Sequence, residues 1–173
     1  MNEFAVRALE PEDSEAIRAI YNWAVANTTA TMDTSSREDV AQKAWMAMHL
    51  SPSRYPAFVA VCDGQVIGYA SLSPYIARDG YRLTAETSVY VHPDFHGRGV
   101  GKGLLSVVVQ QADKLGFVSL LALVSADNAA SIYLHEWHDF KSTGFLRSVG
   151  RKFGQWVDVI ILQRVVHQRT GEE

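Results

Sequence analysis

The segment His96-Gly97-Arg98-Gly99-Val100-Gly101-Lys102-Gly103 has the composition of an anion-binding loop. It lies between an expected strand and an expected helix, so its backbone N–H groups and the positive end of the helix dipole point at one anion-sized space. It is not a P-loop, because Gly103 stands where a Mg²⁺-binding Ser or Thr is required. It is not a dinucleotide fingerprint either, because the third Gly would fall at Lys102 or Leu104. Phosphate binding outside these two classes remains, beside the simpler possibility that the glycines only make a turn.

Metal chemistry and cysteine chemistry are not indicated. His135-Glu136 with His138 resembles part of a zinc motif, but the metalloprotease pattern needs a second His where Asp139 stands. The single Cys62 lies in an apolar run and is best explained as a small buried side chain. We therefore expect no bound metal and no cysteine nucleophile.

Length and composition fit one globular domain over residues 1–173, with 47% hydrophobic and 20% charged residues. The formal net charge of -3 gives no basic field for nucleic acid or anionic lipid. No signal peptide is visible at the N-terminus, and no apolar stretch approaches the ~20 residues of a membrane span. We expect a cytoplasmic protein without nucleic-acid or membrane partners.

The hydrophobic periodicity predicts a mixed α/β domain. Asp63-Gly64 between two apolar runs predicts a hairpin with a type I′ turn. The expected strands span residues 4–9, 57–61, 66–71, 85–92, 117–124, 146–149 and 156–162, and the expected helices carry apolar stripes over 17–25, 37–49, 104–115 and 128–137. The glycine loop thus sits in a strand, helix, strand unit.

Three separated motifs carry a family resemblance. Asp63-Gly64-Gln65-Val66-Ile67-Gly68, Ser88-Val89-Tyr90-Val91-His92-Pro93 and Gly97-Arg98-Gly99-Val100-Gly101 occur in the order typical of GNAT acetyltransferases. Residues 84–91, 134–136 and 152–159 resemble the phosphinothricin and methionine sulfoximine N-acetyltransferase branch. The resemblance covers about residues 4–164. It implies the GNAT fold, a central mixed, mostly antiparallel sheet of about seven strands flanked by about four helices.

The same resemblance implies an enzyme that moves acetyl from acetyl-CoA to an amine by direct attack in a ternary complex. A primary ammonium has no lone pair, so a base must remove its proton, and Glu86 matches the family's glutamate in that role. His135 stands where many relatives have a tyrosine acid, and its imidazole suits an acid or a second base. Tyr133 is rotated by roughly 200° from His135 on a helix, so we expect it in the core or against pantetheine. Packing or capping is the alternative for His135.

The resemblance also implies the cofactor contacts. The backbone of Val89, Tyr90 and Val91 is expected to pair with the pantetheine amides, and Asn128 to bond the same arm, to cap a helix, or both. The pyrophosphate is expected in a cradle made by Gly97, Arg98, Gly99, Val100, Gly101 and Lys102. His96 departs from the Arg or Gln usual there.

For an α-amino-acid acceptor, a planar Arg fork suits the carboxylate, and Arg78 and Arg82 are the candidates. Tyr81 and the segment 28–36, with Met32 in place of the branch's usual aromatic residue, resemble the family's substrate-enclosing elements. Trp156 and Asp158 are expected to stabilise the last strands or to frame the pocket. The family further implies a homodimer.

Two other functions stay open at this point. One is acetylation of another primary amine, such as a peptide N-terminus or a polyamine. The other is a non-catalytic acyl-CoA-binding module, which needs the glycine loop but neither Glu86 nor His135.

Overall fold

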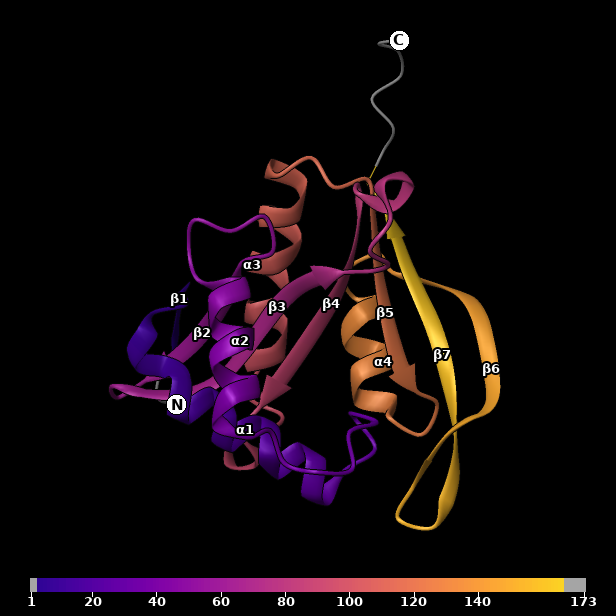
Figure 1. Ribbon diagram of the computed structural model, residues 1–173, viewed down its shortest axis with the longest axis horizontal. Helices are drawn as coiled ribbons and strands as arrows, with labels where there is room; N and C mark the ends of the chain where they lie inside the picture. Colours follow the sequence, from indigo (N-terminus) through magenta and orange to yellow (C-terminus); the bar gives the residue numbers. More distant parts are fainter. Residues whose placement is uncertain (1–2, 167–173) are drawn as a thin grey trace, which may run out of the picture.

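The computed structural model describes residues 3–166, which contain seven strands in one sheet and four α-helices (Figure 1). The sheet order is β1-β2-β3-β4-β5-β7-β6, and only β4 and β5 run parallel. The strands are β1 Ala5–Ala8, β2 Ala57–Cys62, β3 Gln65–Pro74, β4 Thr84–Val91, β5 Ser119–Ser125, β6 Lys141–Lys152 and β7 Gln155–Val165. The helices are α1 Ser14–Asn27, α2 Asp39–His49, α3 Val100–Lys114 and α4 Ala129–Glu136. This mixed, mostly antiparallel architecture confirms the predicted fold class.

The predicted hairpin is present between β2 and β3. Cys62 pairs with Gln65, which leaves Asp63 and Gly64 as a two-residue loop. Both have positive φ, 49° and 78°, as a type I′ turn requires. The turn joins β2 to β3, and the other edge of β3 pairs with β4 in the middle of the sheet.

Helices cover both faces of the sheet. On one face α1 and α2 enclose a core that includes Ile17, Ile20 and Tyr69, while α3 packs on the other face. Leu104, Leu105 and Val108 of α3 are fully buried there. Burial of each side chain contributes about 1.5–3 kcal/mol. The helix that begins at the glycine loop is therefore firmly fixed against the sheet.

The last hairpin differs from the sequence expectation. The strand predicted over 146–149 is β6, which runs from Lys141 to Lys152 and is mostly exposed. Its pairing with β7 shifts register between Ser142 and Gly144 and again between Leu146 and Gly150. Most of β6 is exposed and polar, so the sequence showed a strand pattern only over 146–149, the stretch where the second register shift falls. Within residues 3–166, no helix is long and apolar enough to span a membrane.

Candidate active site

The sheet opens between β4 and β5. The two strands pair only through Thr84–Glu86 and Ser119–Leu121, and beyond this point β5 continues beside β7. Residues 87–91 of β4 therefore have one edge that no strand covers, and α4 contacts β5 near this gap (Figure 1). A strand edge with free amide and carbonyl groups can pair with an extended ligand.

The backbone groups at this edge can be assigned from the alternation along β4. His92 N–H donates to Ile67 O of β3, so Val91 and Val89 direct their N–H and C=O groups to the gap. Tyr90 directs its backbone groups to β3 instead, unlike its two neighbours. His96 Nε2 lies 2.9 Å from Val91 O, which ties the glycine loop to the end of the strand. That contact gives the unusual His96 a structural role.

Glu86 lies where the opening begins. Side chains alternate along a strand, so Glu86 faces the same side as Tyr90, whose ring is 5.2 Å from that of Tyr21 on α1. Among the described residues the Glu86 carboxylate has no hydrogen bond or ion pair, and partial burial raises its pKa. It is thus a half-buried, unengaged carboxylate on the α1 side of the sheet.

His135 lies on the other side of β4. It is 3% exposed, and its Nε2 is 3.4 Å from the hydroxyl of Thr87. Nδ1 lies 2.8 Å from Ser131 O and donates to it, which leaves the Nε2 lone pair toward Thr87. Burial lowers the pKa of His135, opposed by the Ser131 carbonyl and assisted by His138. A neutral imidazole with this geometry can accept a proton at Nε2.

The glycine loop has the geometry of an anion cradle. Gly97 and Gly99 have φ of 73° and 81°, a region that side chains rarely adopt. No side chain caps α3, so N–H groups of its first turn are free for a ligand. Gly101 packs on α4, since a Cβ there would lie 3.2 Å from Leu134 Cδ2. Turn formation and close helix packing both require glycine here, and both leave the amides open.

Asn128 begins α4 as its N-cap residue. Its Oδ1 accepts a hydrogen bond from Ser131 N at 3.0 Å, which confirms the capping role. Tyr133, expected in the core or against pantetheine, is 55% exposed, so a core position is wrong. The face of α4 that carries His135 is turned to the sheet, and the face that carries Tyr133 is turned to solvent.

The segment after α1 is held at the far end of β5. Ser125 Oγ donates to Thr29 O, and Thr29 Oγ1 donates to Asp127. Lys152 of β6 is 3% exposed and donates from Nζ to Thr31 O at 2.7 Å. Met32 fills the space that Gly150 leaves, since a Cβ there would lie 2.5 Å from its Sδ. The segment is thereby fixed to β5, α4 and the last hairpin.

The other acceptor candidates lie at the opposite end of β5. Arg78, Tyr81 and Arg82 are exposed in the connection before β4, and Leu83 O accepts from Val118 N at the start of β5. The seven residues of β5 span about 20 Å. Met32 and the two arginines therefore lie near opposite ends of this strand, and no hydrogen bond, ion pair or ring contact joins them among the described residues.

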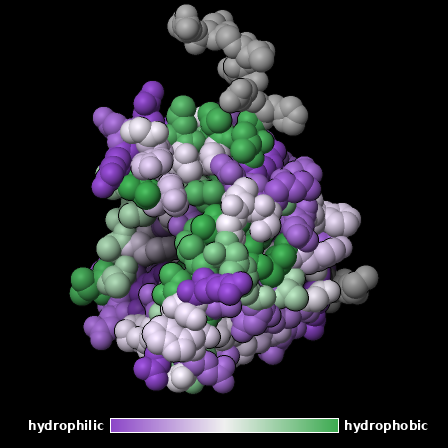
Figure 2. Space-filling model, turned by 90° about the vertical axis from the view of Figure 1, so that its right-hand side faces the viewer, coloured by the Kyte–Doolittle hydropathy of each residue, from purple (hydrophilic) through white to green (hydrophobic). Residues whose placement is uncertain are grey.

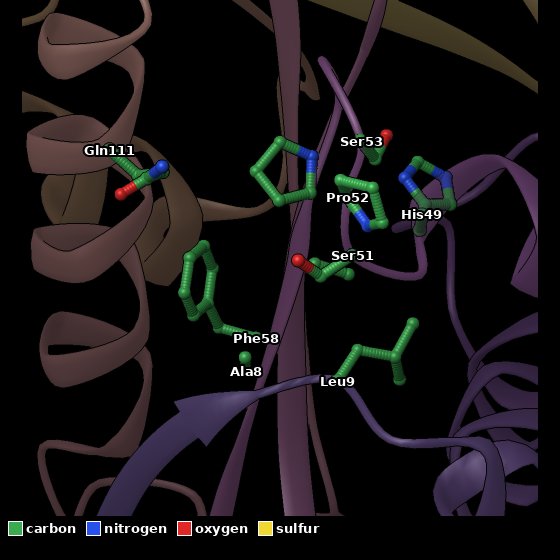
Figure 3. A pocket seen from close by; sticks show the side chains of 10 residues that line it. Ala8, Leu9, His49, Ser51, Pro52, Ser53, Phe58 and Gln111 are labelled. Atoms are coloured by element: carbon green, nitrogen blue, oxygen red, sulfur yellow. The ribbon is translucent and has the colours of Figure 1, made fainter.

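A pocket also lies away from this region. A cavity of about 360 Å³ opens between Gln111 of α3, Phe58 of β2 and the residues that follow α2 (Figure 3). His49 lines it, and its Nε2 has no hydrogen-bond partner among the described residues. No predicted site residue lines this cavity. Within residues 3–166 no group of three or more His, Cys, Asp or Glu side chains could hold a metal ion.

The sequence matches the Acetyltransferase (GNAT) family over residues 17–140, which includes β4, the glycine loop and α4. The chain belongs to the GNAT acetyltransferase family. The matched residues include both strands that border the opening, β4 and β5.

Relatives place the chain within this family. It is 38% identical to the phosphinothricin N-acetyltransferase of Alcaligenes faecalis, over 92% of this chain and 81% of that protein. It is 37% identical to the L-methionine sulfoximine/L-methionine sulfone acetyltransferase of Salmonella typhimurium, over 97% and 98%. The structure of Salmonella typhimurium yncA with its cofactor acetyl-CoA superposes with a TM-score of 0.92 at 35% identity, covering 99% of both chains. This chain is thus related to the phosphinothricin and methionine sulfoximine acetyltransferases, the branch that the sequence predicted.

Two residues of this GNAT site escaped the sequence analysis. Thr87 contacts His135 across 48 residues of chain, and Lys152 contacts Thr31 across 121. A Thr in a strand and a Lys before a turn are ordinary residues for those elements, so neither gave a local signal. Thr87 lies in the motif 84–91 and Lys152 in the motif 152–159, so the family resemblance covered both residues without giving either a role.

Proposed function

We propose that this protein transfers acetyl from acetyl-CoA to the α-amino group of a small amino-acid-like acceptor of the phosphinothricin, methionine sulfoximine or methionine sulfone type. The observation that carries the proposal is the unengaged Glu86 carboxylate at the head of the opening between β4 and β5. The names of the curated relatives support the acceptor class, and the acetyl-CoA complex of yncA supports the donor.

In the proposed donor complex the pantetheine arm lies in the opening. Val89 and Val91 pair with its amides, and Asn128 adds a contact from the start of α4. The backbone of Gly97 through Lys102 holds the pyrophosphate, with Arg98 close by. The thioester then ends near Glu86, because the opening closes there. No metal takes part in this scheme.

The transfer is a direct attack in a ternary complex. Glu86, directly or through one water, takes the proton of the acceptor ammonium. The amine lone pair forms the C–N bond, and His135 takes the second proton that the attacking nitrogen must lose. The tetrahedral intermediate collapses with cleavage of the C–S bond, which gives the amide and CoA thiolate. His135, neutral and facing Thr87, acts as a second base on the other side of the strand rather than as the acid. The acceptor carboxylate pairs with Arg78 or Arg82, beside Tyr81, at the end of β4 where Glu86 lies.

Steady-state kinetics test the reaction order. Initial rates against acetyl-CoA, at several fixed concentrations of methionine sulfoximine, should give lines that intersect in double-reciprocal plots. Parallel lines would indicate an acetyl-enzyme and contradict direct attack. Rates with a polyamine or a peptide equal to those with methionine sulfoximine would favour another primary amine, because a pocket built around a carboxylate rejects acceptors that lack one.

We further propose a cytoplasmic homodimer. The support is an apolar surface on the last hairpin, where Phe145, Val149 and Trp156 are 52%, 55% and 67% exposed. Figure 2, which looks onto the β6–β7 side, shows hydrophobic residues gathered over the middle of this face. Exposed apolar patches of this kind typically mark contact with another protein. Light scattering should return twice the chain mass, and Trp156→Glu should return the monomer; a monomeric parent would contradict the dimer.

A further inference from the structure

Three serines form a hydroxyl row beside Glu86 on the α1 side of the sheet. In the pairing of β3 with β4, Ser73 lies directly opposite Glu86, and Ser71 lies directly opposite Ser88. Directly opposite residues of an antiparallel pair point to the same face of a sheet, as do residues two apart along one strand. The hydroxyl row (Ser71, Ser73 and Ser88) therefore shares the face on which Glu86 and Tyr90 lie.

The neighbouring apolar residues confirm this orientation. Leu72, between Ser71 and Ser73, packs in the core against α3, whereas Tyr69 packs with α1 on the other face. On that face α1 reaches β4 at Tyr90, and neither α1 nor α2 lies over the start of β4 in Figure 1. The hydroxyl row thus extends from the helix-covered part of the face to a part that neither of these helices covers.

The hydroxyl row is not explained by the fold alone. Ser71 is 2% exposed and Ser73 and Ser88 are partly buried, and no hydrogen bond of these hydroxyls is described within residues 3–166. The neighbouring Glu86 carboxylate has no partner in this part of the chain either. Burying a hydroxyl without a hydrogen bond destabilises a fold, and native proteins keep few such groups. A ligand that accepts hydrogen bonds would satisfy the row.

The spacing of the row fits the proposed acceptors. Ser88 follows Glu86 by two residues, an advance of about 7 Å along the strand. In phosphinothricin, methionine sulfoximine and methionine sulfone alike, four bonds separate the α-nitrogen from the phosphorus or sulfur atom, and an oxygen lies one bond further. An extended acceptor with its amine at Glu86 and its carboxylate toward Arg78 or Arg82 therefore places that oxygen beside Ser71 and Ser88.

We propose that the hydroxyls of Ser71 and Ser88 donate hydrogen bonds to the oxygen on the sulfur or phosphorus atom of the acceptor, and so select sulfone, sulfoximine and phosphinate acceptors over the thioether methionine. The proposal rests on the acceptor class of the proposed function and names the residues that recognise it. A thioether sulfur is only a weak hydrogen-bond acceptor, so bound methionine leaves both hydroxyls without partners. A site built to hydrogen-bond one ligand rejects an analogue that lacks the bonding group.

Methionine sulfone and methionine form a matched pair of acceptors, since they differ only in the sulfone oxygens. The parent should have a kcat/KM about tenfold or more higher with the sulfone. Ser88→Ala should lower the kcat/KM for the sulfone about three- to tenfold, the range of one neutral hydrogen bond, and should change that for methionine less than about twofold. Ser71→Ala should have the same effect. Ser88→Thr keeps a hydroxyl and should retain most of the preference.

The kinetic form of the loss separates recognition from catalysis and from folding. Because the sulfone oxygens lie away from the reacting nitrogen, loss of a contact to them should raise the KM for the sulfone and leave kcat near the parent value. The Kd of acetyl-CoA should be unchanged, and the midpoint of thermal unfolding should not fall. Ser142→Ala, which removes an exposed hydroxyl on β6, is the control and should keep the parent kinetics with both acceptors.

Calorimetric titration of the CoA-bound protein with the two acceptors measures recognition without turnover. The parent should bind the sulfone more tightly than methionine, and Ser88→Ala should lose most of the difference. Equal losses for both acceptors, or a preference unchanged in both serine variants, would overturn the hydroxyl row as the recognition site, while acetylation of the sulfone by the parent would still support the proposed function. Serine-dependent binding of the sulfone in a parent that releases no thiol would support the row and reject the proposed function. A parent that binds neither acceptor would overturn both.

Discussion

Glu86 and His135 lie on opposite faces of β4. Glu86 belongs to the strand itself, and His135 of α4 faces the next residue of the strand, Thr87. Glu86 points to the α1 side by the alternation that places Tyr90 there, and Thr87 points to His135 on α4. In the proposed reaction the amine is deprotonated on the first side and the thioester arrives between the strands. The two residues therefore take different protons of the reaction and do not form a dyad.

Glu86→Gln should change stability and activity in opposite directions. Because burial raises the folded-state pKa of Glu86, its ionised form destabilises the fold at pH values above that pKa. The variant should thus have a larger free energy of unfolding at pH 7, a difference that disappears below the unfolded-state pKa of about 4.3. Its kcat should fall about 10²-fold or more, the contribution of a general base. Urea titrations at pH 7 and pH 4 and steady-state rates check both; a variant that is less stable at pH 7 would contradict the burial argument.

Thr87→Val tests the second proton-transfer residue. The change removes the hydroxyl that lies 3.4 Å from His135 Nε2 and also donates to Leu121 O. If His135 acts through Thr87, kcat should fall about tenfold, with the acid limb of the pH profile moved and KM for acetyl-CoA unchanged. Thr87→Ser keeps a hydroxyl and should retain the parent profile. A parent-like pH profile in Thr87→Val would contradict proton transfer by His135 and would indicate that His135 only packs in the core.

At the scale of elements, β4, the loop and α3 were predictable because each has strong local chemistry. The alternation of residues 85–92, the glycines that follow and the apolar stripe of α3 all point to the same unit. The edge strand β6 was predicted only in part, since its exposed face and its two register shifts follow from its pairing with β7. The attachment of the Met32 segment and of the arginine segment to opposite ends of β5 also required the sheet order, which no local pattern reveals.

Gly99→Ala tests the loop as a backbone cradle. Gly99 has φ of 81° and no atom within 4 Å of an added Cβ, so the effect of the substitution is conformational strain rather than collision. The variant should lose about 1 kcal/mol of stability and bind acetyl-CoA about tenfold more weakly. Calorimetric binding and thermal unfolding measure the two effects. Gly80→Ala, also with open space around it and an ordinary φ, is the matched control; equal acetyl-CoA affinities in the two variants would contradict the cradle.

Lys152→Met tests the segment after α1. Lys152 is nearly buried and its ammonium holds Thr31 O, while burial lowers its pKa. Loss of this contact should loosen the segment and raise the KM for the acceptor about tenfold, with the Kd of acetyl-CoA unchanged. Lys141→Met, at the exposed start of the same strand, should change neither. A weakened acetyl-CoA Kd with a normal acceptor KM would place the segment on the donor side instead.

For the whole molecule, buried histidines predict a loss of stability in mild acid. Burial lowers the pKa of both His49 and His135 in the folded state. Below the unfolded-state pKa of about 6.5, the unfolded chain binds protons that the folded chain excludes, so unfolding becomes more favourable as pH falls. The free energy of unfolding should decrease from pH 7 to pH 5, and His49→Gln should reduce this slope. A stability independent of pH over this window would contradict both buried neutral imidazoles.

The most direct measurement is thiol release from acetyl-CoA at pH 7 to 8 with a panel of acceptors. The panel contains phosphinothricin, methionine sulfoximine, methionine sulfone, ordinary amino acids, a peptide and a polyamine. Turnover with the first three, well above that with the peptide and the polyamine, is the result that the proposed function predicts. The absence of thiol release with those three acceptors, in a protein that binds acetyl-CoA, would contradict the proposed function.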